Sequence, residues 1–335
     1  MTALGTHLVR VRGWVNQRRP WLLLFLLAVG LILPFVVKPY YLSLSIEVLI
    51  FAIFAMSLDL LLGYTGLPSF GHAAFFGLGG YVVAYVASTS DLALGLTSNL
   101  LVTVPLVAIV SALVALLIGF LSLRTSGIYF LMITLAFAQM LFSIAIRWSG
   151  VTGGSDGLVG VARPVLGVNP LGYTFSSRES YYFLVLAFFL LSYWLLQRVV
   201  RSPFGWALRG IRENEHRMRA LGYRTFRYKM TAFAISGAFA GVAGMLHVHF
   251  FRGAAPEMLH WTTSGEVLVS LIIGGVGTLV GPALGAAVVT LFPLLVSSYV
   301  DRWETLMGLM FILFVVFAPQ GILGLLRGQG KEEGS

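Results

Sequence analysis

Four ionisable residues stand inside stretches that are otherwise apolar, namely Glu47, Asp59, His72 and Glu266. A charged or imidazole side chain is costly at membrane depth, and such residues often belong to proton relays or ion pathways. Glu47, Asp59 and Glu266 are the candidate buried polar residues, and structural roles stay open for each. Asp59 and His72 could satisfy each other or nearby backbone groups near an inner surface. Glu266 could cap the outer end of a helix, where the helix dipole favours a carboxylate.

Two glycine-rich segments, 63–80 and 274–285, could hold a path through the protein. Small residues allow close helix packing, which is the simpler interpretation. Breaks at Gly66-Leu67-Pro68 and at Gly281-Pro282 would instead leave backbone groups that must face protein or a water-filled path. Thr134 and Gln139 could line such a path or bond across helices. The candidate path residues are Gly71, His72, Phe75, Thr134, Gln139, Gly274, Gly275 and Gly277.

Motifs for catalysis are missing from the sequence. There is no Gly-x-Ser-x-Gly nucleophile elbow, because the one run with that spacing, 153–157, lies in the predicted outer loop. There is no His-Glu-x-x-His motif either, and the acidic residues are scattered, which disfavours an intramembrane enzyme. The three lysines, Lys38, Lys229 and Lys331, lie outside any P-loop motif, so the chain cannot be its own nucleotide-driven motor. Cysteine is absent, which excludes disulfides and thiolate metal sites. We expect no cofactor or metal on this chain.

The composition points to lipid as the solvent. Of 335 residues, 58% are hydrophobic and 10% are charged, whereas soluble domains are about 45–50% apolar and about 25% charged. A span needs roughly 17–25 mostly apolar residues. We therefore predict an all-α integral membrane protein of about ten spans, of which the third and eighth are short, rich in glycine, and bent, broken or re-entrant. The windows are 21–37, 43–63, 70–88, 99–123, 127–147, 179–200, 230–251, 264–280, 282–300 and 305–323.

Basic residues predict the orientation. With both termini inside, 16 of the 22 Lys and Arg residues lie on the inner side and six on the outer side, as expected for cytoplasmic loops. The net charge of +9 therefore reflects topology rather than nucleic-acid binding. Spans in 43–147 and 230–323 run in opposite directions, which is the arrangement of an inverted repeat. The predicted parts are a cytoplasmic N-terminus (1–20), a transmembrane domain (21–323), an outer loop (148–178), an inner loop (201–229) and a cytoplasmic tail (324–335).

Two local segments carry further expectations. The basic start followed by an apolar run could be a signal peptide, but Lys38-Pro39 follows that run instead of a small-residue cleavage site. The outer loop, with its glycines and prolines, is expected to be ordered by turns rather than by helix.

The inner loop predicts one amphipathic helix over 203–221. Ser202 before Pro203 is a helix start, and Gly222 is a left-handed C-terminal stop. Apolar residues recur between them at helical spacing. Such a helix could rest on anionic lipid headgroups. Acidic residues are less expected on a lipid-binding face, so the run Glu213-Asn214-Glu215 favours a protein partner. The apolar positions are Leu208, Ile211, Met218 and Leu221.

This loop also carries a resemblance. The runs 201–215 and 220–222, read as Arg-Ser-Pro-Phe-Gly-Trp-Ala-Leu-Arg-Gly-Ile-Arg-Glu-Asn-Glu and Ala-Leu-Gly, resemble the coupling loop of LivM-type permeases of bacterial branched-chain amino-acid ABC importers. The match covers about residues 45–325 in the family's order. Trp206 and Pro68 depart from the family, which usually has a basic residue and often a glutamine there. Further matching stretches are 63–77, 127–139, 152–157 and 266–287.

The resemblance implies a type II ABC importer permease in a bacterial inner membrane. Its implied partners are two ATPase subunits that hold ATP and Mg²⁺, a second permease, a periplasmic binding protein that docks on the outer side, and membrane lipid. The implied cargo is a branched-chain amino acid, although related permeases carry other amino acids, urea or short amides. An ion-coupled secondary transporter for small polar solutes remains an alternative, but it does not explain helix 203–221. The expected ATPase-coupling residues are Arg209, Arg212, Glu213, Asn214, Leu221 and Gly222.

Overall fold

A computed structural model describes residues 30–167, 172–296, 303–317 and 321–326. The basic N-terminus (1–20), most of the first predicted span (21–37) and the tail beyond residue 326 lie outside the described residues. Residues 30–36 of the first span are helical.

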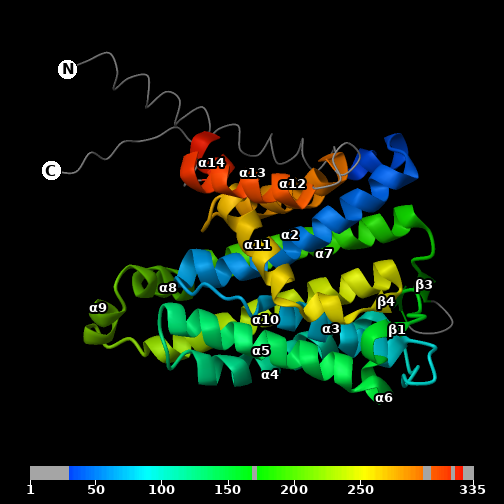
Figure 1. The fold of residues 1–335 in the computed structure, drawn as a ribbon, viewed down its shortest axis with the longest axis horizontal. Coiled ribbons are helices and arrows are strands. Elements are labelled where there is room, and N and C mark those ends of the chain that lie inside the picture. The colour runs from blue at the N-terminus through cyan, green and yellow to red at the C-terminus, as the bar shows by residue number, and fades with distance from the viewer. Residues whose placement is uncertain (1–29, 168–171, 297–302, 318–320, 327–335) are drawn as a thin grey trace, which may run out of the picture.

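Five helices are long and apolar enough to cross a membrane (Figure 1). They are α2 (Pro39–Thr65), α4 (Leu100–Ser122), α5 (Ile128–Arg147), α7 (Arg178–Arg201) and α10 (Thr225–Phe251). Four apolar helices are shorter: α3 (His72–Ala87), α11 (Trp261–Gly274), α12 (Val280–Val296) and α13 (Trp303–Phe317). The remaining short helices are α6 (Ser149–Thr152), α8 (Pro203–Glu213), α9 (Glu215–Ala220) and α14 (Gly321–Leu326), with 3-10 turns η1 (Gly154–Asp156) and η2 (Pro256–Leu259).

The prediction of about ten spans is therefore confirmed only in part, whereas the third and eighth predicted spans are short, as the sequence indicated. At a rise of about 1.5 Å per residue, the 16 residues of α3 and the 14 residues of α11 reach about 24 Å and about 21 Å, short of a hydrocarbon core of about 30 Å. Gly66 (φ 75°) ends α2 before α3, and Gly275 (φ 111°) follows α11. The two glycine-rich segments interrupt their spans at these left-handed positions.

Several helix starts follow from side chains that accept otherwise unpaired backbone N–H groups. Asn99 accepts the N–H of Leu101 (3.0 Å) before α4, and Ser177 accepts the N–H of Ser180 (3.1 Å) before α7. These caps explain why both helices lie within one residue of their predicted windows.

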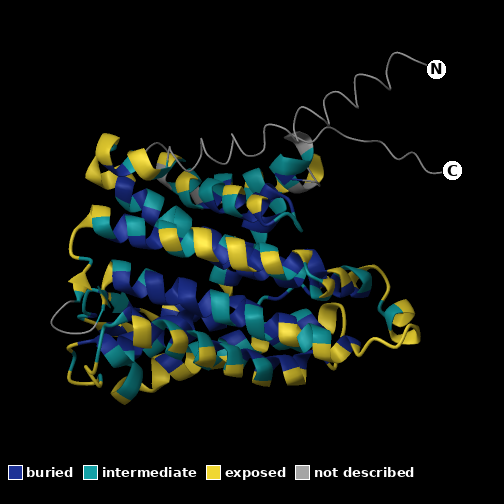
Figure 2. Ribbon diagram, turned by 180° about the vertical axis from the view of Figure 1, so that it is seen from behind, coloured by how far each residue is buried: buried dark blue, intermediate teal, exposed yellow. Residues whose placement is uncertain are grey.

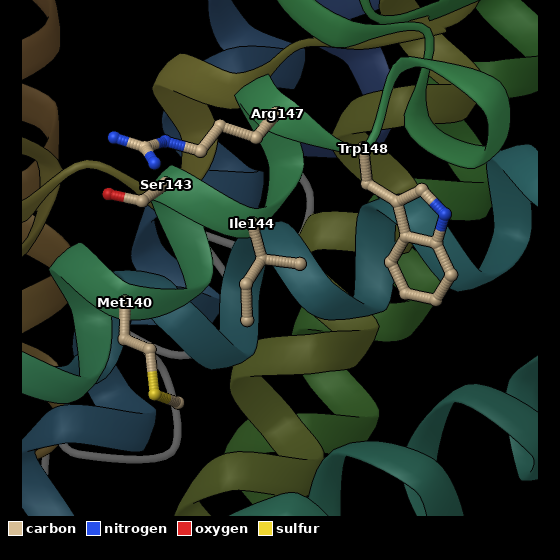
Figure 3. A pocket seen from close by; sticks show the side chains of 5 residues that line it. All are labelled: Met140, Ser143, Ile144, Arg147 and Trp148. Carbon is tan, nitrogen blue, oxygen red and sulfur yellow. The ribbon is translucent and has the colours of Figure 1, made fainter.

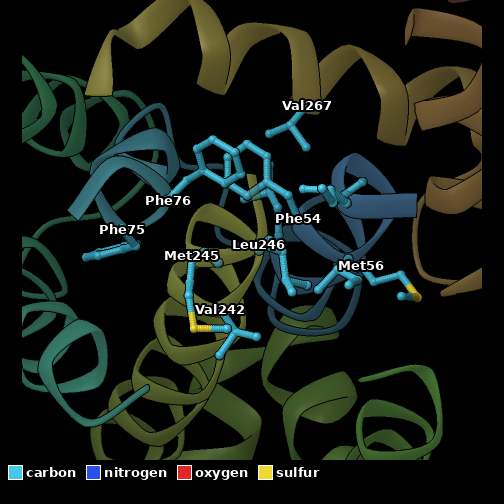
Figure 4. Packing of buried hydrophobic residues seen from close by; sticks show 14 of the residues in the cluster. Phe54, Met56, Phe75, Phe76, Val242, Met245, Leu246 and Val267 are labelled. Atoms are coloured by element: carbon cyan, nitrogen blue, oxygen red, sulfur yellow. The ribbon is translucent and has the colours of Figure 1, made fainter. Parts of the chain in front are cut away.

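The core is centred on α2 and α10, which pack against each other. Helix α4 lies on the far side of α10, and α12 lies on the far side of α2. Aromatic and aliphatic side chains from α2, α3, α10 and α11 fill the space between them (Figure 4). Exposed positions concentrate on the outer surfaces of the bundle and on α8–α9 (Figure 2).

The outer loop 148–178 contains more regular structure than predicted. It includes α6 and η1, together with strands β1 (Leu158–Val159), β2 (Val165–Leu166) and β3 (Tyr173–Thr174). Strand β1 pairs antiparallel with β4 (Gly253–Ala254), and β2 pairs antiparallel with β3. The expectation of turns without helix was wrong, because Thr152 forms hydrogen bonds to the carbonyls of Ala145 and Trp148 that stabilise the single turn of α6. Helices α8 and α9 lie at the opposite end of the bundle (Figure 1).

Candidate coupling segment and helix breaks

The predicted helix 203–221 is two helices. Helix α8 starts after Ser202, whose hydroxyl accepts the N–H of Gly205 (3.4 Å), as the sequence predicted. It ends at Glu213, where Asn214 adopts an extended backbone (φ −158°, ψ 96°). The Asn214 side chain accepts the N–H of Arg217 (2.9 Å) and starts α9, because asparagine is a preferred N-cap residue. Gly222 has φ 88°, as expected for a left-handed stop.

The apolar face of α8 packs onto the bundle, whereas α9 has no buried residue. Leu208 and Ile211 are buried, and Trp206 is 63% exposed on the opposite side. Leu221, the last of the apolar positions predicted at helical spacing, is 67% exposed, because the helix breaks at Asn214 and Leu221 follows the end of α9.

Two of the predicted coupling residues extend back onto α2. The guanidinium of Arg209 lies 5.0 Å from the ring centre of Tyr64 and 4.9 Å from that of Trp206. Arg212 donates through Nη1 to the carbonyl of Gly63. Glu213 and Asn214 are exposed on the surface between α8 and α9. Arg209 and Arg212 therefore connect α8 to the C-terminal turn of α2.

Glu215, which the sequence pattern did not single out, connects α9 to α10. Its carboxylate accepts from Arg219 (2.7 Å) and Thr225 (3.0 Å), and it pairs with Lys229 on α10. Partial burial raises the pKa of Glu215, but hydrogen bonds from Lys229 and Arg219 outweigh it and lower the pKa to about 2. The spacing of Glu215 and Arg219 at i and i+4 could have indicated the first pair, whereas no local pattern points to Lys229.

Asp59 and His72 do not pair with each other. Asp59 is fully buried, and its carboxylate accepts the N–H groups of Gly277 (2.6 Å) and Leu279 (3.0 Å) in the loop between α11 and α12. His72 is also fully buried and lies 2.8 Å from the hydroxyl of Ser57 through Nε2. Because Ser57 donates to the carbonyl of Phe54 (2.6 Å), its oxygen is free to accept from the His72 ring.

The candidate path residues form two buried groups. Around the start of α3, a Cβ added at Gly71 would lie 2.6 Å from the carbonyl oxygen of Thr134, and the rings of His72 and Phe75 are 5.9 Å apart. The second group contains Gly274 at the end of α11, and Gly275 and the half-buried Gly277 in the loop beside Asp59. Gln139 on α5 is half-buried and belongs to neither group.

The C-terminal end of α5 carries an open groove that no sequence pattern indicated. Its volume is about 440 Å³. Figure 3 shows its side chains, which are apolar apart from one hydroxyl and one guanidinium. They are Met140, Ser143, Ile144, Arg147 and Trp148.

The prediction that Glu266 is buried was wrong, because its side chain lies on the exposed face of α11. It does not cap the helix either. His260 is the N-cap residue of α11, and the hydroxyl of Ser264 caps α3 by accepting the N–H of Ala73 (2.8 Å). Glu47 is half-buried in α2.

A long apolar bundle with two interrupted spans and a basic amphipathic segment at one end matches a known family. Residues 40–317 match the model of the branched-chain amino acid transport system permease component. The chain belongs to this family. It is therefore a multi-pass membrane protein and a permease component of the branched-chain amino acid ABC transport family, which is a transport subunit rather than an enzyme.

Relatives of known function agree with the family. The high-affinity branched-chain amino acid transport system permease protein LivM of Salmonella typhimurium is 28% identical over 330 residues, covering 92% of this chain and 76% of LivM. LivM of Escherichia coli is also 28% identical, over 328 residues with the same coverage. The autoinducer 2 import system permease protein LsrC of Klebsiella pneumoniae is 30% identical over 160 residues, covering 44% of this chain and 42% of LsrC. No solved structure matches the chain.

Proposed function

We propose that this permease forms half of the translocation path of an ABC importer for branched-chain amino acids. The observation that carries the proposal is α8, which extends from the end of the bundle, buries Leu208 and Ile211, and leaves Trp206 and Glu213 exposed. Such a face suits a docked protein, because aromatic residues are enriched at interfaces.

The ATPase subunits would dock on α8 and the start of α9. Glu213, Asn214 and the exposed edge of Trp206 would contact the ATPase, with Leu221 and Gly222 at the rim. Arg209 and Arg212 would act on the other side of the same helix, through Tyr64 and Gly63. ATP and Mg²⁺ would stay on the ATPase subunits.

The positive-inside count supports a cytoplasmic location for α8, α9 and both termini in a bacterial inner-membrane protein. The transmembrane domain would then span 21–323, between the basic N-terminus (1–20) and the tail (324–335), with the coupling loop at 201–229. The strand-containing loop 148–178 would face the periplasm and receive the substrate-loaded binding protein. A second, homologous permease would complete the path.

The packing order supports an inverted repeat. Both α2 and α10 have 27 residues, and each is followed by a residue in the left-handed region, Gly66 (φ 75°) and Arg252 (φ 59°). Each then leads to a short helix, α3 or α11. Helix α4 packs on α10, and α12 packs on α2. If α2 corresponds to α10 and α4 to α12, exchanging the two halves leaves these contacts unchanged, as expected for an inverted repeat.

For cargo we propose leucine, isoleucine or valine. The basis is the coverage of 92% of this chain by LivM relatives, against 44% by LsrC. The test is uptake of radiolabelled leucine into proteoliposomes that contain the chain with its co-purified partner subunits. We expect uptake only with ATP and Mg²⁺ on the side of the ATPase. Gradient-driven uptake by the chain alone would instead indicate an ion-coupled transporter.

The docking surface is tested by the double variant Trp206→Ala, Glu213→Ala in a pull-down of the ATPase from detergent. We expect association to be lost. The matched control is Trp194→Ala with Glu179→Ala on α7, which removes an exposed tryptophan and an exposed glutamate away from α8 and should leave association unchanged. Association that survives in the first variant would place the ATPase elsewhere.

A further inference from the structure

Three segments that are distant in the sequence meet at the C-terminal turn of α2. Asp59 in α2 accepts the N–H groups of Gly277 and Leu279 in the loop 275–279. Arg212 of α8 donates to the carbonyl of Gly63, one turn further along α2. A Cβ added at Gly277 would lie 3.2 Å from the Gly63 oxygen and 3.5 Å from Nη1 of Arg212. We call this meeting point the α2 junction.

Each side chain in the α2 junction supplies a charge that a helix end lacks. The last turn of α2 has no basic residue, and the first turn of α12 has no acidic residue. Arg212 brings a cation to the carbonyl end of α2, and Asp59 brings a carboxylate to the N–H groups just before α12. Both arrangements satisfy backbone groups that a helix end leaves unpaired, and both match the helix dipole.

The segments that meet at the α2 junction are closely packed. A Cβ added at Gly63 would lie 2.2 Å from Oδ1 of Asp59, and one at Gly66 would lie 3.0 Å from Cγ of Arg212. Because Asp59 is fully buried, breaking its hydrogen bonds would leave a polar group unsatisfied in an apolar core. A displacement of α8 is therefore transmitted to α2 rather than absorbed between them.

We propose that Asp59 and Arg212 are positioning residues that transmit movement of α8 to the loop 275–279. This loop separates α11 from α12, so its position sets where the two interrupted helices end within the bundle. The inference rests on the proposed function, in which a docked ATPase moves α8. Arg212 carries that movement to the last turn of α2, and Asp59 carries it from α2 to the loop.

The test compares Asp59→Asn and Arg212→Gln with two matched controls in the assembled transporter. Asp59→Asn turns an accepting oxygen into an amide donor that faces backbone N–H groups. Asp91→Asn makes the same chemical change at an exposed loop position. Arg178→Gln removes an arginine that donates to the carbonyl of Pro39 (3.4 Å), at the other end of α2.

The measured quantity is leucine taken up per ATP hydrolysed in proteoliposomes. We expect a drop of about tenfold in both test variants, as for the loss of a hydrogen bond to a charged group. ATPase association and ATP hydrolysis should persist, and both controls should match the wild type. The double variant should take up no less leucine per ATP than either single variant, because both changes break the same connection between α8 and the loop 275–279.

A second readout separates coupling from folding. The chain has no cysteine, so the Val276→Cys variant places a unique thiol in the loop. We expect its maleimide reaction rate to change on ATP binding, and we expect this change to disappear with Asp59→Asn or Arg212→Gln.

If Asp59→Asn does not fold, Arg212→Gln decides, because Arg212 is exposed outside the core. The inference, but not the proposed function, would be overturned if Arg212→Gln took up as much leucine per ATP as the wild type and its Val276→Cys thiol still reacted with maleimide at a rate that changes on ATP binding. Failure of the unmodified transporter to couple uptake to ATP would overturn the proposed function and the inference together.

Discussion

The carboxylate of Asp59 accepts the backbone N–H of Gly277 at 2.6 Å, across a sequence separation of 218 residues. One end of this contact lies in the first predicted half-repeat and the other lies in the second. It joins α2, one turn before Gly63, to the break between α11 and α12. Arg212 extends the same connection to α8 on the proposed cytoplasmic face.

The close approach at this turn predicts the effect of Gly63→Ala. The added methyl group would lie 2.2 Å from Oδ1 of Asp59 and 2.6 Å from the nitrogen of Gly277. Overpacking of this kind typically costs about 1–3 kcal/mol, so we expect a lower thermal unfolding midpoint in detergent. Gly150→Ala is the control, because a Cβ there meets nothing within 4 Å. Equal midpoints for the two variants would show that Asp59 can move away without cost.

The contact between α11 and α3 predicts a second stability effect. The hydroxyl of Ser264 accepts the N–H of Ala73 in the first turn of α3. We expect Ser264→Ala to lower the free energy of unfolding by about 1 kcal/mol, as for loss of an N-cap. Ser270→Ala removes a buried hydroxyl that donates only to Val267 in its own helix, and it should have a smaller effect. The reverse order of the two effects would contradict the capping role of Ser264.

Local signals predicted the long helices well. The windows 99–123 and 179–200 correspond to α4 (Leu100–Ser122) and α7 (Arg178–Arg201), because apolar runs and polar caps coincide at their ends. Helix α10 begins at Thr225, five residues before its window, because its first turn is polar and hydropathy does not detect it.

Long-range contacts were not predictable in the same way. Nothing near Asp59 in the sequence points to the loop 275–279, and nothing near Glu215 points to Lys229. The break at Asn214 did have a local signal, because asparagine before an acidic first turn is a common helix start. Glu266 was expected to be buried because it lies in an apolar run, but hydropathy cannot tell which face of a helix meets the core.

The ion pairs of Glu215 predict how α9 responds to pH. The pKa of this carboxyl lies below its ordinary value of 4.5, at about 2. A depressed folded-state pKa contributes stability above the unfolded value, and this contribution is lost as the pH falls through the folded value. We expect the amide protection of α9 to stay constant from neutral pH down to about 4.5, and to fall between there and about 2.

Hydrogen exchange, corrected for intrinsic rates, measures this effect. Glu215→Gln should lower the protection of α9 already at neutral pH, whereas Glu213→Gln, at an exposed position in the preceding helix, should not. Equal protection in Glu215→Gln and the wild type would mean that the ion pairs to Arg219 and Lys229 do not hold α9.

The most direct measurement is the side of the membrane on which α8 and α9 lie. In the cysteine-free chain, Arg217→Cys places a single thiol on the exposed surface of α9. We predict that a membrane-impermeant maleimide leaves this thiol unmodified in intact cells but modifies it in inverted membrane vesicles stripped of the ATPase. Binding the ATPase again to these vesicles should block the modification. Modification in intact cells would place the segment outside and contradict its role as the ATPase contact.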